Sequence, residues 1–327
     1  MEEPHQIKRK GLLSVILLSY YSGNRIITTF ESLSDILKKE EIDFEFIIVD
    51  DGSKDNSFLL ASELEKRHKN VRAYQLSRNY TSNYAIFAGL FLCNGDCAIP
   101  IPDDEQQPYH TLVEMYRMWE NGEQLIIPHR IKRNDGFLTN LYAKTFYRVI
   151  NAFSDIKYPE GGADTFFIDR ELIQIINSRI HPINTSIMSE VLRLGFDTKY
   201  YPYERVKSLN KKSRWTFRKK FRQAKDTFFS SSTWPVRFIT TLGIFFSLFA
   251  LAMIVFYTYI RLFGNPGFWG DYLPGWTSTV VIISLFSGLI LFSLGIIAEY
   301  IWRIYEEVKN RPGYIIKKRE EQNETER

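Results

Sequence analysis

Two long apolar runs in the C-terminal part of the chain restrict its fold more than any other feature. Phe238 to Leu262 and Trp276 to Ile297 are almost unbroken in apolar residues. Each run supplies the roughly 20 residues that an α-helix needs to cross a bilayer. Two buried core helices are the alternative, but both runs are apolar on every helical face, and aromatic residues gather near their ends as in an interfacial belt. The sequence therefore predicts two transmembrane helices, spanning about 238–262 and 276–297.

Charge around these runs predicts their orientation. Lys and Arg cluster before the first run and after the second, whereas the segment 263–275 between them has neither residue. Positive flanks stay in the cytoplasm. The polar segment Met1 to Lys10 has no signal-peptide core. We therefore expect an integral membrane protein with a helical hairpin, in which the domain before the first span and both termini are cytoplasmic.

The part of the chain before the spans alternates short apolar runs with longer amphipathic ones. This order of strands and helices predicts an α/β fold, a doubly wound and mostly parallel sheet with helices on both faces. The expected strands are 12–19, 44–49, 71–76, 97–101 and 125–127, and the expected helices are 26–39, 57–68, 82–93 and 111–119. Only two cysteines, Cys93 and Cys97, are present, which excludes a disulfide framework.

Four segments follow from these patterns. Residues 1–210 form the cytoplasmic domain, and 211–235 form a juxtamembrane segment in which Phe alternates with Lys and Arg. That composition is typical of a helix lying in the lipid headgroups, although an ordinary surface helix is the alternative. Residues 236–303 form the hairpin, and 304–327 form a cytoplasmic tail.

Two acidic motifs fall at the ends of expected strands, where open α/β sheets bind their ligands. Asp50-Asp51-Gly52-Ser53 follows the second strand. Its carboxylates can accept hydrogen bonds from a nucleobase or ribose, and Gly52 permits a tight turn. The same residues also describe a plain turn that leads into a helix.

The second motif follows the fourth strand and contains Asp103, Asp104 and Glu105. Consecutive carboxylates can hold Mg²⁺ or Mn²⁺ through hard oxygen ligands, and the cation would stabilise a departing diphosphate as a Lewis acid. A solvated acidic loop is the alternative interpretation. The position opposite the first acidic turn favours the metal.

At this point the chain resembles the GT-A fold glycosyltransferases of family 2, in the branch of the dolichol-phosphate mannose synthases and bacterial polyprenyl-phosphate glycosyltransferases, which has two C-terminal transmembrane helices. The resemblance covers nearly the whole chain. The residues that carry it are Ile48-Val49-Asp50-Asp51-Gly52-Ser53, Leu76-Ser77-Arg78-Asn79, Gly95-Asp96, Asp104 with Gln106 and Pro108, Phe146-Tyr147-Arg148, Glu299-Tyr300 and Arg303 to Pro312.

The resemblance implies a role for individual residues. The donor nucleotide would be bound by Asp50, Asp51, Ser53, Arg78, Asp103 and Gln106. Asp104 and Gln106 fall on the metal motif, with Asp103 as a further ligand. The catalytic group would comprise Asp164, Asp104 and Arg133. Contacts to the acceptor phosphate would come from Arg130, Arg205, Ser213 and Arg214.

Three departures from the family pattern affect this site. Pro102 stands where the metal motif has its first Asp, so the metal shell would shift to Asp103 or lose a ligand. Ser22 stands where the family has an acid after the first strand. The expected Gly-Lys pair after Asn79 is absent.

The acceptor follows from the distribution of charge. A sugar hydroxyl needs a general base, whereas a lipid monophosphate, with a second pKa near 6, is already largely anionic and needs cations to position it. Basic residues gather where the domain meets the expected membrane. Juxtamembrane Lys and Arg also simply attract anionic lipid, and we give this explanation equal weight.

The sequence therefore predicts an inverting hexosyltransferase in a bacterial inner membrane. It would use Mg²⁺ or Mn²⁺ and a UDP- or GDP-sugar, and would glycosylate a polyprenyl phosphate for cell-envelope modification, with no nucleic-acid partner. Gly288 and Gly295 would allow the spans to associate as a homo-oligomer. Direct transfer to a glycan or lipid-linked saccharide is the alternative, and a non-catalytic membrane scaffold is the second.

Overall fold

The structure is a computed structural model. It describes residues 9–104, 107–130, 165–204, 234–263 and 275–317, together with 145, 148, 151, 152, 157–159 and 163. The chain divides into two compact units, Met1–Ser231 with Pro312–Arg327, and Ser232–Arg311. Each unit is considered by itself.

The first unit is built on a seven-stranded sheet with the strand order β3-β2-β1-β4-β6-β5-β7. The strands are β1 (Leu13–Ser19), β2 (Phe44–Asp50), β3 (Val71–Gln75), β4 (Cys97–Pro102), β5 (Leu125–Arg130), β6 (Phe167–Asp169) and β7 (Thr198–Tyr203). The helices are α1 (Arg25–Lys39), α2 (Ser57–Arg67), α3 (Ser82–Leu92), α4 (His110–Glu120), α6 (Arg170–Arg179) and α7 (Ile187–Arg193). All neighbouring strands run parallel except β6, which is antiparallel to both β4 and β5.

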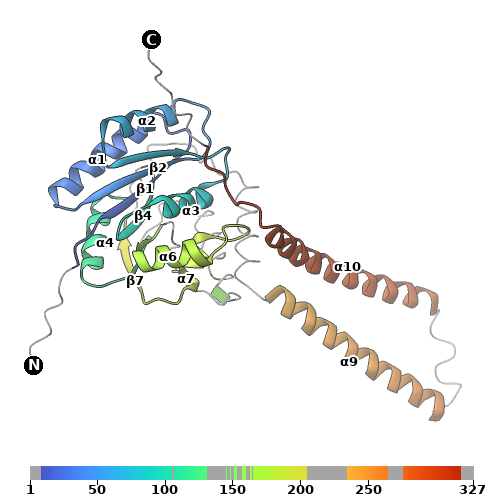
Figure 1. The fold of residues 1–327 in the computed structure, drawn as a ribbon. Helices are drawn as coiled ribbons and strands as arrows, with labels where there is room; N and C mark the ends of the chain where they lie inside the picture. Colours follow the sequence, from blue (N-terminus) through green and yellow to red (C-terminus); the bar gives the residue numbers. More distant parts are fainter. Residues whose placement is uncertain are drawn as a thin grey trace, which may run out of the picture. The chain divides into compact units, whose positions relative to one another are not determined.

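Each face of the sheet has its own hydrophobic core. Leu13, Val15 and Leu17 of β1 point to the face covered by α1, α2 and α4, whereas Ile16 points to the face covered by α3, α6 and α7. This alternation has the period of two that a strand requires. Figure 1 shows α1 and α2 on one side of the sheet and α3 and α6 on the other. The expected doubly wound, mostly parallel α/β sheet is confirmed.

The first four strands and first four helices lie within one residue of the predicted bounds, whereas β5 begins as predicted and continues three residues further, to Arg130. The sequence did not predict β6, β7, α6 or α7. Strand β6 has only three residues, too few to show a period, and it is a strand because it fills the space between β4 and β5. Cys93 and Cys97 are buried free thiols.

A short C-terminal segment, Pro312–Lys317, belongs to the sheet unit rather than to the helices that precede it. Ile316 forms an antiparallel bridge with Leu76, just beyond β3. The Ser77 N–H donates to the Ile315 carbonyl at 2.8 Å, and the Lys317 N–H donates to the Gln75 carbonyl at 2.8 Å. We call this segment the C-terminal strap. It pairs with the last residue of the edge strand β3 and with the two residues that follow it, and thus occupies hydrogen-bonding groups that an open edge would expose.

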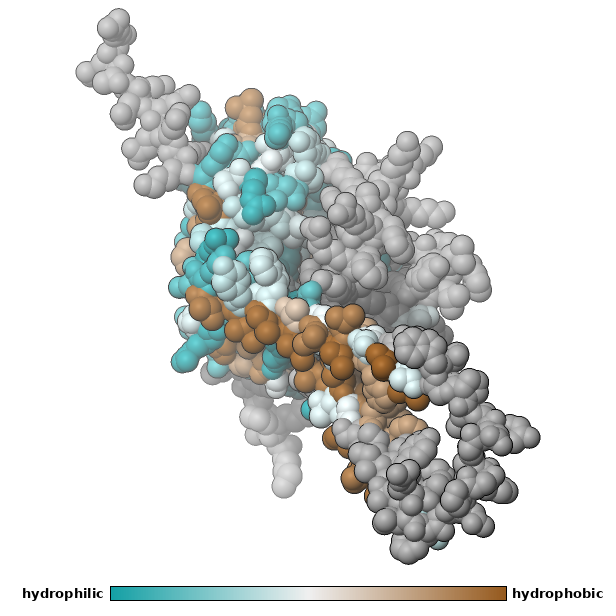
Figure 2. All heavy atoms as spheres, turned by 90° about the vertical axis from the view of Figure 1, so that its right-hand side faces the viewer, coloured by the Kyte–Doolittle hydropathy of each residue, from teal (hydrophilic) through white to brown (hydrophobic). Residues whose placement is uncertain are grey.

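The second unit contains the helices α9 (Trp234–Phe263) and α10 (Gly275–Val308). Phe246 and Phe286 meet edge to face with ring centroids 5.5 Å apart. Figure 2 shows apolar side chains gathered over these helices. Among the described residues, Leu285–Val308 is long and apolar enough to cross a membrane, and Trp234–Phe246 is a shorter apolar helix. One span is therefore supported, and the expected two-span hairpin is not confirmed.

Candidate functional site

The direction of the strands brings both acidic motifs to one edge of the sheet. β1, β2, β3 and β4 are mutually parallel, so the residues after them lie at the same edge. β5 also runs with β4, since β6 is antiparallel to both. Asp51, Arg78, Asp103 and Arg130 all follow or end these strands. This carboxyl edge is where doubly wound sheets bind ligands.

Asp50 organises the first acidic turn from within. Its side chain has no exposed surface. Its carboxylate accepts hydrogen bonds from the Ser53 N–H at 2.9 Å, the Ser53 hydroxyl at 2.5 Å and the Gln75 amide at 3.0 Å. A longer bond of 3.3 Å comes from the Ser19 hydroxyl. Asp50 therefore fixes the ends of β1, β2 and β3 relative to one another.

Asp51 connects this turn to the segment after β3. Its two carboxylate oxygens accept the Tyr80 N–H at 2.7 Å and the Thr81 N–H at 2.9 Å. Burial raises the pKa of Asp51 from 3.8 to about 6, although both N–H donors act to lower it. Thr81 has a φ of 89°, a strained value for a residue with a Cβ atom. Asp51 thus holds residues 80–81 in the conformation that begins α3.

Gly52 and Arg78 bring the two segments into contact. Gly52 has a φ of 70°, and a Cβ atom there would lie 2.4 Å from the Arg78 carbonyl carbon. The Arg78 guanidinium lies 4.1 Å from the centroid of the Tyr80 ring. Arg78 is exposed, and its positive charge acts to lower the pKa of Asp51 in the acidic turn.

The second acidic motif meets a cation that the sequence did not single out. Arg25 forms an ion pair with Asp103 at 2.9 Å. The sequence did contain a sign of this cation. Arg25 closely follows Ser22 and starts a helix, and the start of a helix is an unfavourable place for a positive charge unless an anion lies nearby. Gln75 was also missed, since an amide at a strand end has no distinctive pattern.

The residues after β4 include candidate ligands for a divalent cation. Asp103 and Asp104 are adjacent carboxylates, and Mg²⁺ is usually bound by one or two carboxylates together with substrate phosphates. The described residues contain no group of three or more His, Cys, Asp or Glu side chains that could hold a metal. The donor set fits a cation that shares its shell with a phosphate ligand.

Arg130 ends β5, and its Nε donates to the Tyr203 hydroxyl at 3.4 Å. On the neighbouring segment, Ala163 bridges His129, and the Thr165 hydroxyl donates to the Pro100 carbonyl of β4. The chain on both sides of position 164 is therefore anchored close to the ends of β4 and β5.

The remaining predicted site residues lie outside the described residues. These are Gln106, Arg133, Asp164, Arg205, Ser213 and Arg214.

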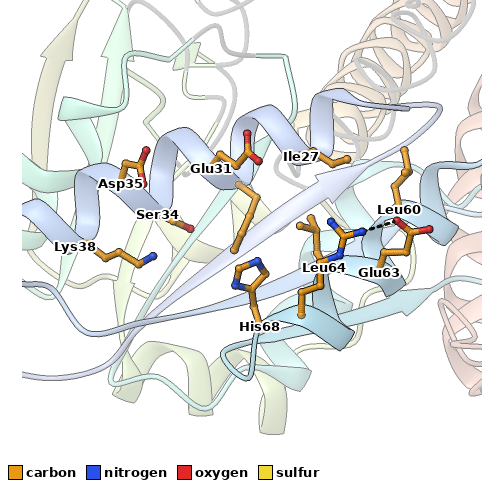
Figure 3. Close-up of a pocket in the computed structure, with 11 residues that line it drawn as sticks. Ile27, Glu31, Ser34, Asp35, Lys38, Leu60, Glu63, Leu64 and His68 are labelled. Carbon is orange, nitrogen blue, oxygen red and sulfur yellow. Dashed lines mark ion pairs between the residues drawn. The ribbon is translucent and has the colours of Figure 1, made fainter.

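A separate hollow lies between α1 and α2 (Figure 3). Glu31, Asp35 and Lys38 line one side, and Glu63 pairs with Arg67 on the other at 3.6 Å. None of the predicted site residues lines it. This hollow is thus distinct from the acidic turns.

Both acidic turns thus lie at the edge of the sheet where doubly wound folds bind their ligands. The model of glycosyl transferase family 2 matches residues 14–180 of the chain. The chain belongs to this family and is a glycosyltransferase.

Several curated relatives match over nearly their whole length. The putative glycosyltransferase CsbB of Bacillus subtilis is 30% identical, covering 94% of this chain and 92% of the relative. The SfII prophage-derived bactoprenol glucosyl transferase of Shigella flexneri is 30% identical, covering 94% and 97%. The solved mannosyltransferase PcManGT of Pyrobaculum calidifontis, in complex with GDP-Man and Mn²⁺, is 14% identical with a TM-score of 0.48, covering 93% of this chain and 88% of that chain.

Proposed function

We propose that this glycosyltransferase moves a sugar from a UDP- or GDP-linked donor to a polyprenyl phosphate. The observation that carries this proposal is the 30% identity, over 94% of the chain, to a bactoprenol glucosyl transferase. The carboxyl-edge site and the apolar helix Leu285–Val308 support it, because the acceptor lipid resides in the membrane.

On the donor side, Asp51, Ser53 and Arg78 would contact the nucleotide, and Asp50 would hold their turn in place. Asp50 is suited to this indirect role because its carboxylate is saturated by internal donors. Asp104 with Gln106, and Asp103 as a further ligand, would hold Mg²⁺ or Mn²⁺. When bound, the cation would supply Lewis-acid stabilisation of the departing diphosphate.

The transfer would be an inverting, in-line displacement. A phosphate oxygen of the acceptor forms the bond to the anomeric carbon, while the bond to the donor diphosphate breaks and its electron pair leaves with the nucleoside diphosphate. Arg130, Arg133, Arg205, Ser213 and Arg214 would position the acceptor phosphate, since Arg binds phosphate in a bidentate manner. Asp164 would orient the acceptor or sugar, because a phosphate that is already ionised needs no strong base.

The membrane arrangement is part of the same proposal. Spans at about 238–262 and 276–297 would form a hairpin in a bacterial inner membrane, with the segments 1–210, 211–235 and 304–327 cytoplasmic. The Lys- and Arg-rich flanks support this orientation. Association of the spans through Gly288 and Gly295 would give a homo-oligomer.

The test uses the full chain in detergent with Mg²⁺, undecaprenyl phosphate and a panel of UDP- and GDP-sugars, and identifies products by mass spectrometry. We expect a monoglycosylated lipid phosphate from the wild type and from Asp35→Ala, an exposed acid on α1 away from the site. The product should be strongly reduced in Asp104→Ala. Transfer only to a glycan or lipid-linked saccharide would instead support the alternative acceptor, and absence of transfer from every donor would contradict the proposal.

A further inference from the structure

Arg25 lies at the junction of the two acidic turns. It is the first residue of α1, and α1 begins shortly after the carboxyl end of β1 at Ser19. β1 and β4 are neighbouring parallel strands with Leu18 opposite Pro102. A side chain from the start of α1 can thus reach Asp103, 78 positions further along the chain.

The Arg25 guanidinium is fixed on one side and open on the other. Its Nε and Nη2 donate to the same Asp103 oxygen, at 3.2 and 2.9 Å, and Nη2 also donates to the Tyr21 carbonyl at 3.2 Å. Among the described residues, Nη1 makes no hydrogen bond. The side chain keeps 30% of its surface exposed. Two N–H groups of a fixed guanidinium therefore face away from the protein partners.

The same residue is tied to the nucleotide turn. The Tyr21 N–H donates to the Ser53 hydroxyl at 2.9 Å, and Ser53 in turn donates to Asp50. A continuous chain of hydrogen bonds thus connects Arg25 with the residues that shape the first acidic turn. A ligand that spans both turns would meet the guanidinium.

The position of Arg25 is electrostatically costly unless an anion is nearby. The N-terminal end of a helix carries partial positive charge, so a cation there is disfavoured. The first turn of α1 has no acidic residue that would compensate. Asp103 offsets part of the cost, and its partly exposed pair with Arg25 contributes little stability by itself. The positive charge that Asp103 leaves uncompensated at the start of α1 would attract a bound polyanion.

We propose that Arg25 is a binding residue for the donor diphosphate and that Asp103 is its positioning residue. Arg suits this role because its planar donor fork matches phosphate oxygens and its charge is permanent. The guanidinium would contact the diphosphate in the bound donor and in the departing product. This inference rests on the proposed function, because it presupposes a nucleotide-sugar donor.

The test measures direct binding of UDP, GDP, UMP and GMP to the full chain in detergent by calorimetry, once with Mg²⁺ and once with EDTA. The variants are Arg25→Gln, Arg25→Lys, Asp103→Asn and the control Arg67→Gln, an exposed cation on α2. A lost charge-assisted hydrogen bond to a phosphate should weaken diphosphate binding about tenfold to a hundredfold. Monophosphate binding should change much less in Arg25→Gln. Arg25→Lys should recover part of the affinity, and Asp103→Asn should show a smaller loss than Arg25→Gln.

Each contrary outcome has a separate meaning. Equal diphosphate affinity in Arg25→Gln and the wild type would overturn the inference and leave the proposed function standing. If the wild type also binds the diphosphates with EDTA, a loss seen only with Mg²⁺ would overturn the inference, because Arg25 would then act through a cation at Asp103. If Arg25→Gln bound nucleoside mono- and diphosphates equally more weakly and also had a lower melting temperature, the role of Arg25 would be structural and the inference would fail. A wild type that binds no nucleotide at all would contradict the proposed function itself.

Discussion

Gly52→Ala should separate backbone strain from steric collision at the nucleotide turn. Gly52 has a φ of 70°, where an L-residue costs about 1–2 kcal/mol. The added Cβ would lie 2.4 Å from the Arg78 carbonyl carbon and 2.7 Å from its Cα. These are backbone atoms, so relief requires the turn and the segment after β3 to separate. Overpacking of this kind costs about 1–3 kcal/mol more.

Gly195→Ala is the matched control. Its φ of 75° is nearly the same, but nothing lies within 4 Å of its added Cβ. Thermal unfolding in detergent should show a clearly larger loss of melting temperature for Gly52→Ala. UDP or GDP binding should weaken only in Gly52→Ala, because the turn carries Asp51. Equal destabilisation by the two substitutions would refute the steric argument, and unchanged nucleotide binding in Gly52→Ala would refute the placement of the donor site.

Four further substitutions test other parts of the structure. Asp51 has a pKa of about 6 when folded and 3.8 when unfolded, so the folded protein binds more protons between these values and its stability should fall as pH rises from about 4 to 6. Asp51→Asn should flatten that part of the profile of melting temperature against pH, and an unchanged slope would contradict the argument that burial raises the pKa of Asp51. Ser34→Ala should raise the free energy of unfolding by about 1 kcal/mol, because the Ser34 hydroxyl is buried without a partner in the described part of the chain. Ser57→Ala should lower it by about 1–3 kcal/mol, because the Ser57 hydroxyl accepts two backbone N–H groups. If a denaturant titration showed Ser34→Ala to be the less stable variant, neither hydrogen-bonding argument would stand. Tyr314→Ala should loosen the C-terminal strap and increase amide hydrogen exchange at Ser77 and Lys317, and unchanged exchange at both positions would mean that the strap is held by its backbone bonds alone.

Much of the sheet could be predicted because its first half is locally encoded. The β1 and β2 runs are apolar and flanked by turn residues, and α1 has a clear amphipathic period. The turn at Asp50–Ser53 could be predicted for the same reason, since it directly follows an apolar strand. What a local pattern could not give was the function of each carboxylate. Asp50 and Asp51 are adjacent in sequence, yet Asp50 is saturated by Ser53 and Gln75, whereas Asp51 supports residues 80–81.

The sequence by itself determined the order of strands and helices, the position of both acidic motifs at strand ends, and the presence of apolar helices after the sheet unit. These features depend on residues that are close in the chain, where spacing alone specifies the conformation. Only the tertiary structure decided that β6 enters between β4 and β5, that Arg25 reaches Asp103, and that the C-terminal strap returns to Leu76. Such pairings join distant segments, and they form because buried hydrogen-bonding groups, charges and sheet edges must find partners that no local pattern specifies.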